Sequence, residues 1–119
     1  MDFKEILSKL IEKTPGGLGA ALVAKDGLIV ESWTKEGFAV DEIAVHITQP
    51  LMKSENSVKN ARIGIFEEML LFTDKFSLIL KNITDEYFLM TVIDRSCGIY
   101  GKGRYEADKT IKKLRPELV

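Results

Sequence analysis

The chain has 119 residues, of which 45% are hydrophobic, and its 17 basic residues nearly balance its 18 acidic ones. This length and apolar content fit one compact domain over residues 1–119 and leave no room for a second. The balanced charge gives no indication of a nucleic-acid partner. A single cysteine, Cys97, excludes an internal disulfide, and no apolar run approaches the ~20 residues of a membrane span. We therefore expect a cytoplasmic protein that does not insert into a membrane.

The first predicted elements are a helix and a hairpin. Over residues 2–13, apolar side chains recur at helical spacing opposite a charged face, which predicts an amphipathic helix ended by Pro15. Two apolar runs follow, Leu18 to Lys25 and Leu28 to Ser32, and the Asp26-Gly27 pair between them favours a two-residue type I′ turn. The first run is apolar on both faces, so we expect a sheet covered by helices on both sides.

A second helix is predicted from Asp41 to about Asn60. Pro50 lies inside this pattern and should kink the helix or split it into two. The inward stripe consists of Val40, Ile43, Ala44, Ile47, Leu51 and Val58. The polar residues of this segment then face outward.

Beyond Asn60 the hydrophobic period changes from helical to extended. Three strands are predicted, over Phe66–Phe72, Phe76–Ile83 and Tyr87–Asp94, separated by short polar breaks at meander spacing. Three glycines, Gly98, Gly101 and Gly103, then loosen the chain before a last helix over about residues 104–114, which Pro116 ends.

The resulting order is α-β-β-α-β-β-β-α. It predicts an α/β (α+β) fold, a three-layer sandwich with a five-stranded antiparallel sheet, the middle helix on one face and the first and last helices on the other. The apolar run Phe66–Phe72 would lie at a sheet edge, and an exposed apolar edge strand is suited to pairing with another chain. We therefore expect a dimer. The predicted interface consists of Phe66, Glu68, Leu70, Leu71, Phe72, Ile47 and Leu51.

Nothing in the chain predicts catalysis, a cofactor or a metal site. His46 is the only histidine, and on an outward helical face it reads as a surface residue rather than a base. Cys97 reads as a small, partly buried packing residue, although flanking arginines leave a reactive thiol open. The glycines after it lack the ending of a phosphate-binding loop. The side chains of Glu67 and Glu68 point to opposite faces of a strand, so the two carboxylates cannot act together on one substrate. We expect these charges instead to protect the edge strand or to pair with basic residues.

Several segments together resemble the Roadblock/LC7 domain family. The entry Pro15-Gly16-Gly17-Leu18-Gly19 and the hairpin through Lys25-Asp26-Gly27-Leu28 are similar to the start of that domain. Glu67 to Phe72 and Phe76 to Leu80 resemble its third and fourth strands, and Cys97 to Tyr105 its glycine-rich entry to the last helix. The resemblance covers essentially the whole chain.

This resemblance implies a non-enzymatic dimer that acts on small Ras-like GTPases or serves as an adaptor, and among prokaryotic members it is closest to the MglB type, which regulates an MglA-type GTPase. The chain ends soon after its last predicted helix, without the C-terminal extension of such proteins, which weighs against full GTPase-activating or exchange function. Family precedent places the contacts on the paired middle helices. The expected partner-binding residues are Glu42, Val45, His46, Gln49, Met52, Lys53 and Asn56.

Three alternatives stay open. Val45 and Met52 suit a binding surface, but both could instead pack across the dimer interface. The dimer could form with a second copy or with a paralogue. The whole domain could also be a small-ligand sensor or an adaptor module in a signalling or motility complex, because helix–sheet folds of this size also serve as sensory modules.

The middle helix has no arginine before Arg62, so any activation would reposition the GTPase's own switch residues.

Overall fold

The first helix forms where its charged and apolar positions separate onto two faces. The computed structural model describes residues 2–97 and 99–118, and in it helix α1 spans Phe3–Lys13. The Asp2 carboxylate caps this helix by accepting a hydrogen bond of 3.2 Å from the backbone N–H of Glu5. The apolar face of α1 is buried through Leu7, Leu10 and Ile11. The predicted amphipathic helix is confirmed.

Five strands form one antiparallel sheet. They are β1 (Gly17–Ala24), β2 (Ile29–Thr34), β3 (Glu68–Phe72), β4 (Phe76–Asn82) and β5 (Tyr87–Asp94), and they lie in the order β2-β1-β5-β4-β3. The sheet edges are therefore β2 and β3, so the predicted edge position of β3 is confirmed. Strand β1 is an inner strand, between β2 and β5, and is buried on both faces, as its apolar sequence requires.

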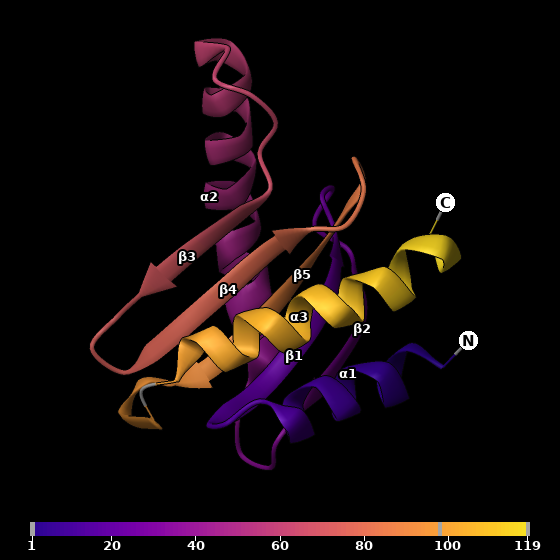
Figure 1. Ribbon diagram of the computed structural model, residues 1–119, viewed down its shortest axis with the longest axis vertical. Helices are drawn as coiled ribbons and strands as arrows, with labels where there is room; N and C mark the ends of the chain where they lie inside the picture. Colours follow the sequence, from indigo (N-terminus) through magenta and orange to yellow (C-terminus); the bar gives the residue numbers. More distant parts are fainter. Residues whose placement is uncertain (1, 98, 119) are drawn as a thin grey trace.

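The helices cover both faces of the sheet (Figure 1). Helices α1 and α3 (Tyr100–Leu114) lie side by side on one face, where they pack on Ala20, Leu22 and Leu89. Helix α2 (Val40–Ala61) covers the other face and packs on Ala21, Val23 and neighbouring strands. The three-layer α+β arrangement predicted from the sequence is confirmed. Two short 3₁₀ turns, η1 (Arg95–Cys97) and η2 (Arg115–Glu117), flank α3.

The β1–β2 turn differs from the predicted two-residue type I′ turn. The Gly27 N–H donates to the Ala24 carbonyl (2.9 Å), and the Ala24 N–H donates to the Leu28 carbonyl (2.8 Å). Gly27 has φ of +103°, whereas Asp26 does not have positive φ. This pattern is a three-residue loop with a type I turn and a glycine bulge. The Asp26 carboxylate accepts the Leu28 N–H (3.0 Å), which fixes its conformation.

Helix α2 is continuous through Pro50. The proline therefore does not split the helix, although it removes the N–H that would bond to the His46 carbonyl. The helix extends past the sheet at its C-terminal end (Figure 1), where Arg62 closes it in the left-handed conformation. The Ile63 N–H then donates to the Val58 carbonyl, as in a Schellman cap.

The last helix begins four residues earlier than predicted. Gly101 and Gly103 lie in its first turn, where we expected a loose loop. Gly103 is buried, and a Cβ at this position would lie 2.5 Å from Ile93 Cδ1 and 2.9 Å from Thr14 Cγ2. The glycine thus allows α3 to approach the sheet and α1 closely. Gly98 lies outside the described residues.

Candidate functional site

The outer face of α2 carries the residues predicted to bind a partner. Glu42, Val45, His46, Gln49, Lys53 and Asn56 are all exposed, and Met52 is half-buried. Val45 is 61% exposed, which is unusual for an apolar side chain on a helix that packs on a sheet. The prediction that these positions lie off the buried stripe is confirmed by this placement. Their binding role stays a prediction.

Five of these predicted residues line one hollow on the surface. It has a volume of about 340 Å³ and lies between α2 and the β1–β2 turn. The lining residues from α2 are Val45, Thr48, Gln49, Met52, Lys53 and Asn56, and those from the turn are Lys25, Asp26 and Gly27. Glu42 and His46 lie on the same helix outside this lining. The contribution of the turn could not be read from the sequence, because helix periodicity places residues on a helix face but not beside a distant loop.

An ion pair sets the position of α2 beside this turn. Lys25 Nζ lies 2.8 Å from Glu55 Oε2, and its side chain is 6% exposed. Asn82 Nδ2, from β4, donates to the same Glu55 oxygen at 2.7 Å. Burial raises the pKa of Glu55, but the hydrogen bonds from Lys25 and Asn82 outweigh it and leave the pKa below its ordinary value of 4.5. Sequence patterns gave no signal for this group of three.

The residues predicted to form a dimer interface lie on both faces of β3, on the segment before it and on α2. Leu71, on the α2 side, is half-buried, and so are Phe66 and Ile47. Phe72 is 44% exposed at the opposite face, where its ring contacts Tyr100 edge-on at 5.1 Å. Leu51 is fully buried in the core and offers no surface to a partner, so it does not belong to the interface that we develop below.

Glu68 pairs with basic residues, as one of the two sequence interpretations expected. Lys81 Nζ lies 3.1 Å from Glu68 Oε1, and Arg104 Nε donates to the same oxygen at 2.9 Å. The Arg104 hydrogen bond lowers the pKa of Glu68 below 4.5. The strand begins here and not at Phe66, because the Phe66 carbonyl accepts the Asn82 side-chain amide (3.0 Å) and leaves the ladder.

The described residues show no cluster for metal or nucleophilic chemistry. Across residues 2–97 and 99–118, His, Cys, Asp and Glu form no group of three that could hold a metal ion. Cys97 is exposed, which corrects the expectation of a partly buried packing residue, because it lies in the turn η1 after the sheet ends. None of the described helices is long and apolar enough to cross a membrane.

A five-stranded antiparallel sheet with two helices on one face and one long, outwardly polar helix on the other defines a three-layer α+β class of domain. The Roadblock/LC7 domain profile matches residues 3–94, and the chain belongs to this family. The family is a non-enzymatic adaptor and regulatory fold.

Solved structures share the fold at low identity. A Roadblock/LC7 domain from Streptomyces avermitilis is 19% identical, with coverage of 99% of this chain and 98% of that chain and a TM-score of 0.85. MglB from Myxococcus xanthus is 16% identical, with coverage of 97% and 86% and a TM-score of 0.84. MglC from the same organism is 22% identical, with coverage of 98% and 99% and a TM-score of 0.72. Comparison with curated proteins gave no match.

Proposed function

We propose that this protein is a dimeric adaptor that binds a small Ras-like GTPase of the MglA type through the outer face of α2 and modulates its nucleotide state or GTP hydrolysis. The observation that carries this proposal is the hollow beside the β1–β2 turn. It collects exposed side chains of α2, apolar Val45 and polar Gln49 among them, beside the half-buried Met52. Such a mixture suits a non-obligate protein interface. The structural likeness to MglB supports the choice of partner class.

The dimer part of this proposal depends on the free edge of β3. Hydrogen bonds from Asn82 to Glu67 and from Thr73 to Phe76 show that odd-numbered residues of this segment bond to β4. The backbone groups of Glu68, Leu70 and Phe72 therefore point away from the sheet. No described residue forms a hydrogen bond with the outward-pointing backbone N–H or C=O of these three residues. These groups are a template for another strand.

The opposite edge of the sheet is protected. Lys4 Nζ, from α1, donates to the Ser32 carbonyl of β2 at 3.1 Å and lies 3.4 Å from Glu31 Oε1. A lysine and an acidic side chain at an edge disfavour strand pairing. This contrast between the two edges favours β3 as the dimer contact.

The register that best fits a two-fold axis is centred on Leu70. In this arrangement Leu70 faces Leu70 of the second copy, and Met69 faces Leu71 of the second copy on the α2 side. A shift centred on Leu71 instead places Glu68 opposite Asp74 of the second copy, which is repulsive. Ile63 and Ile65, which lead into β3, are 73% and 91% exposed and extend the apolar surface at this edge.

The alternative, a small-ligand sensor, needs an enclosed apolar cavity. The hollow beside α2 is instead open to solvent, and polar side chains form much of its lining. A polar, open surface fits a protein partner better than a small apolar ligand.

The test is a calorimetric titration of the protein with a purified MglA-type GTPase loaded with GDP or with a non-hydrolysable GTP analogue. We expect tighter binding in one nucleotide state. Because α2 has no arginine before Arg62, any activation is expected to act through the GTPase's own residues. Equal absence of binding in both states would overturn the proposal.

A further inference from the structure

The outward side of α3 carries a row of lysines. Of the exposed residues of this helix, five are basic and Asp108 alone is acidic. The α3 stripe is the part of this row that recurs at intervals of three and four residues and so shares one helix face: Lys102, Tyr105, Lys109, Lys112 and Lys113. The opposite side of the helix packs on the sheet and on α1 through residues such as Ala107 and Ile111. The stripe therefore faces solvent on the side of the molecule away from α2.

The positive charge of the protein is concentrated on this helix. Helix α3 has five basic and two acidic residues, although acidic residues outnumber basic ones in the whole chain by 18 to 17. Helix α2, on the other face of the sheet, has two basic and three acidic residues. In residues 2–13, beside α3, three lysines balance three carboxylates. An anionic partner is therefore attracted to the α3 side of the molecule and not to the α2 side.

The free cations of this helix are lysines and not arginines. Arg104 Nε donates to Glu68 Oε1 at 2.9 Å, and Arg115 Nε donates to a backbone carbonyl after β4 at 2.9 Å. Lys112 and Lys113, in contrast, form no ion pair within residues 2–97 and 99–118. A guanidinium matches the fixed oxygens of one phosphate, whereas an ammonium group on a flexible stem is a point charge. Such point charges suit an anionic surface whose charged groups move.

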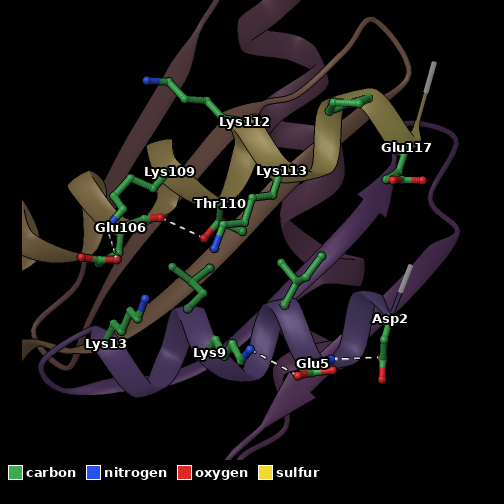
Figure 2. A pocket seen from close by; sticks show the side chains of 13 residues that line it. Asp2, Glu5, Lys9, Lys13, Glu106, Lys109, Thr110, Lys112, Lys113 and Glu117 are labelled. Carbon is green, nitrogen blue, oxygen red and sulfur yellow. Dashed lines mark hydrogen bonds and ion pairs between the residues drawn. The ribbon is translucent and has the colours of Figure 1, made fainter.

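An exposed tyrosine lies in the middle of the α3 stripe. The Tyr105 ring is 56% exposed, and Lys102 Nζ and Lys109 Nζ lie 5.1 Å and 5.3 Å from its centroid. Both lysines also pair with the buried Glu106, at 3.0 Å and 3.7 Å, which offsets one of the four positive charges. Figure 2 shows Lys109 beside Glu106 and Lys112 pointing away from α1. A tyrosine among lysines suits the headgroup level of a bilayer, where its ring is in apolar contact and its hydroxyl is hydrated.

We propose that the α3 stripe docks the protein on an anionic lipid bilayer, with Tyr105 at the headgroup level and the lysines against the lipid phosphates and carboxylates. Four to eight basic residues at a bilayer surface are enough for such attraction. The core already uses the apolar face of α3, so the protein lies on the headgroups and does not enter the hydrocarbon.

Two other anionic partners fit this surface less well. An acidic peptide needs a groove or a strand edge, but Lys102 and Tyr105 lie outside the groove between α1 and α3, on the convex side of one helix. A nucleic acid is bound best by arginines, and Arg104 is already paired with Glu68. A planar anionic surface requires neither a groove nor an arginine.

The proposed dimer would double this docking face. Pairing of two β3 strands about a two-fold axis perpendicular to the sheet places both α3 helices on one side of the joined sheet and both α2 helices on the other (Figure 1). A GTPase bound to α2 would then face away from the bilayer. This step rests on the proposed dimer, whereas the stripe is complete in a single chain.

The test is co-sedimentation of the protein with vesicles of phosphatidylcholine, either alone or with about 30% phosphatidylserine. We expect at least about tenfold tighter binding to the phosphatidylserine vesicles at about 0.1 M salt, and loss of most of that binding at about 0.5 M salt, where the charges are screened. Equal binding to the two kinds of vesicle, or no binding to either, would overturn the proposal.

Paired variants locate the docking face. Each lysine close to an anionic bilayer strengthens binding by about fivefold, so K112E/K113E should weaken binding to phosphatidylserine vesicles at least about tenfold. The control K35E/K59E, the same charge change outside α3, should bind within about twofold of the unsubstituted protein. Thermal unfolding of both variants confirms that they fold. Equal losses in the two variants would contradict the assigned location.

Two further measurements separate the lipid from other ligands and from the dimer. If single-stranded RNA or polyglutamate binds more tightly than phosphatidylserine vesicles, and K112E/K113E abolishes that binding, the lipid assignment is wrong. Leu70→Pro, which blocks pairing through β3, should bind the vesicles more weakly than the unsubstituted protein. If L70P binds equally well and K112E/K113E still weakens binding, the dimer is contradicted and the stripe is supported.

Discussion

Lys25, after the last residue of β1, and Glu55, on the second turn from the C-terminal end of α2, form a nearly buried ion pair with a nitrogen-to-oxygen distance of 2.8 Å. The pair joins the turn and the helix that together line the α2 hollow. The geometry of the proposed GTPase surface therefore depends on an interaction beneath it.

Substitution of Glu55 by alanine should destabilise the protein. It leaves the Lys25 ammonium, 6% exposed, without its partner and removes an acceptor from Asn82. Because Glu55 itself is 27% exposed, we expect a loss of about 1–3 kcal/mol rather than the larger cost of a fully buried pair. Urea unfolding measures it, with the exposed Glu42→Ala on the same helix as the control. A loss in E55A no larger than in E42A would contradict a structural role for the pair.

Acid should destabilise the protein through Glu68. The pKa of this carboxyl is held below 4.5 in the folded state, chiefly by Arg104, so the unfolded chain takes up the proton first as the pH falls. The contribution of the ionised Glu68 carboxylate to the stability of the fold is present above pH 4.5 and is lost as the pH falls through the folded-state pKa. Between pH 7 and pH 3, the free energy of unfolding should fall less steeply in Glu68→Gln than in the unsubstituted protein. Arg104→Gln should show an intermediate slope. Identical slopes in all three proteins would show that the Glu68 pairs do not persist in solution.

Two neighbouring glycines of α3 should respond in opposite directions to alanine. A Cβ at Gly103 meets Ile93 and Thr14 at less than 3 Å, so Gly103→Ala should cost about 1–2 kcal/mol. A Cβ at Gly101 meets nothing within 4 Å, so Gly101→Ala should stabilise the helix by about 0.5–1 kcal/mol. Thermal unfolding compares them. The same sign in both variants would contradict the close approach of α3 at Gly103.

A proline at the free edge should separate dimerisation from folding. The Leu70 N–H points away from β4, so Leu70→Pro removes no hydrogen bond within the sheet but blocks pairing with a second copy. We expect light scattering to show a monomer for L70P. The control is Ser32→Pro on the opposite edge, where the Ser32 N–H donates to the Glu31 carboxylate at 3.0 Å and not to β1. If L70P stayed dimeric while S32P became monomeric, the dimer contact would lie at β2 and not at β3, which would contradict the proposal.

Most of the fold could be predicted from the sequence because each element leaves a local pattern. The helical period of the apolar residues predicted α1 and α2. The run of β1, apolar on both faces, predicted that helices cover both faces of the sheet. The start of α3 was missed because glycine is read as a loop signal. At Gly103 it instead serves the packing of a helix against the sheet, which only the tertiary structure shows.

The candidate site could be predicted only in part, for the same reason. Helical spacing identified the exposed α2 positions, including Val45 and Gln49. It could not show that the turn at Asp26 lies beside them, nor that Leu51 has no exposed surface. The lysines of α3 lie in a helix that the sequence predicts, but the sequence could not show which basic residues of that helix are already paired, as Arg104 is with Glu68.

The most direct test of a dimeric GTPase-binding adaptor is the mass of its complex in solution. Size exclusion with light scattering should be run on the protein mixed with an MglA-type GTPase in the GDP form and in the GTP-analogue form. We expect one nucleotide form to give a complex that contains two 13.4 kDa chains together with the GTPase. A mass of one 13.4 kDa chain, with the GTPase eluting separately in both forms, would contradict both the dimer and its proposed partner.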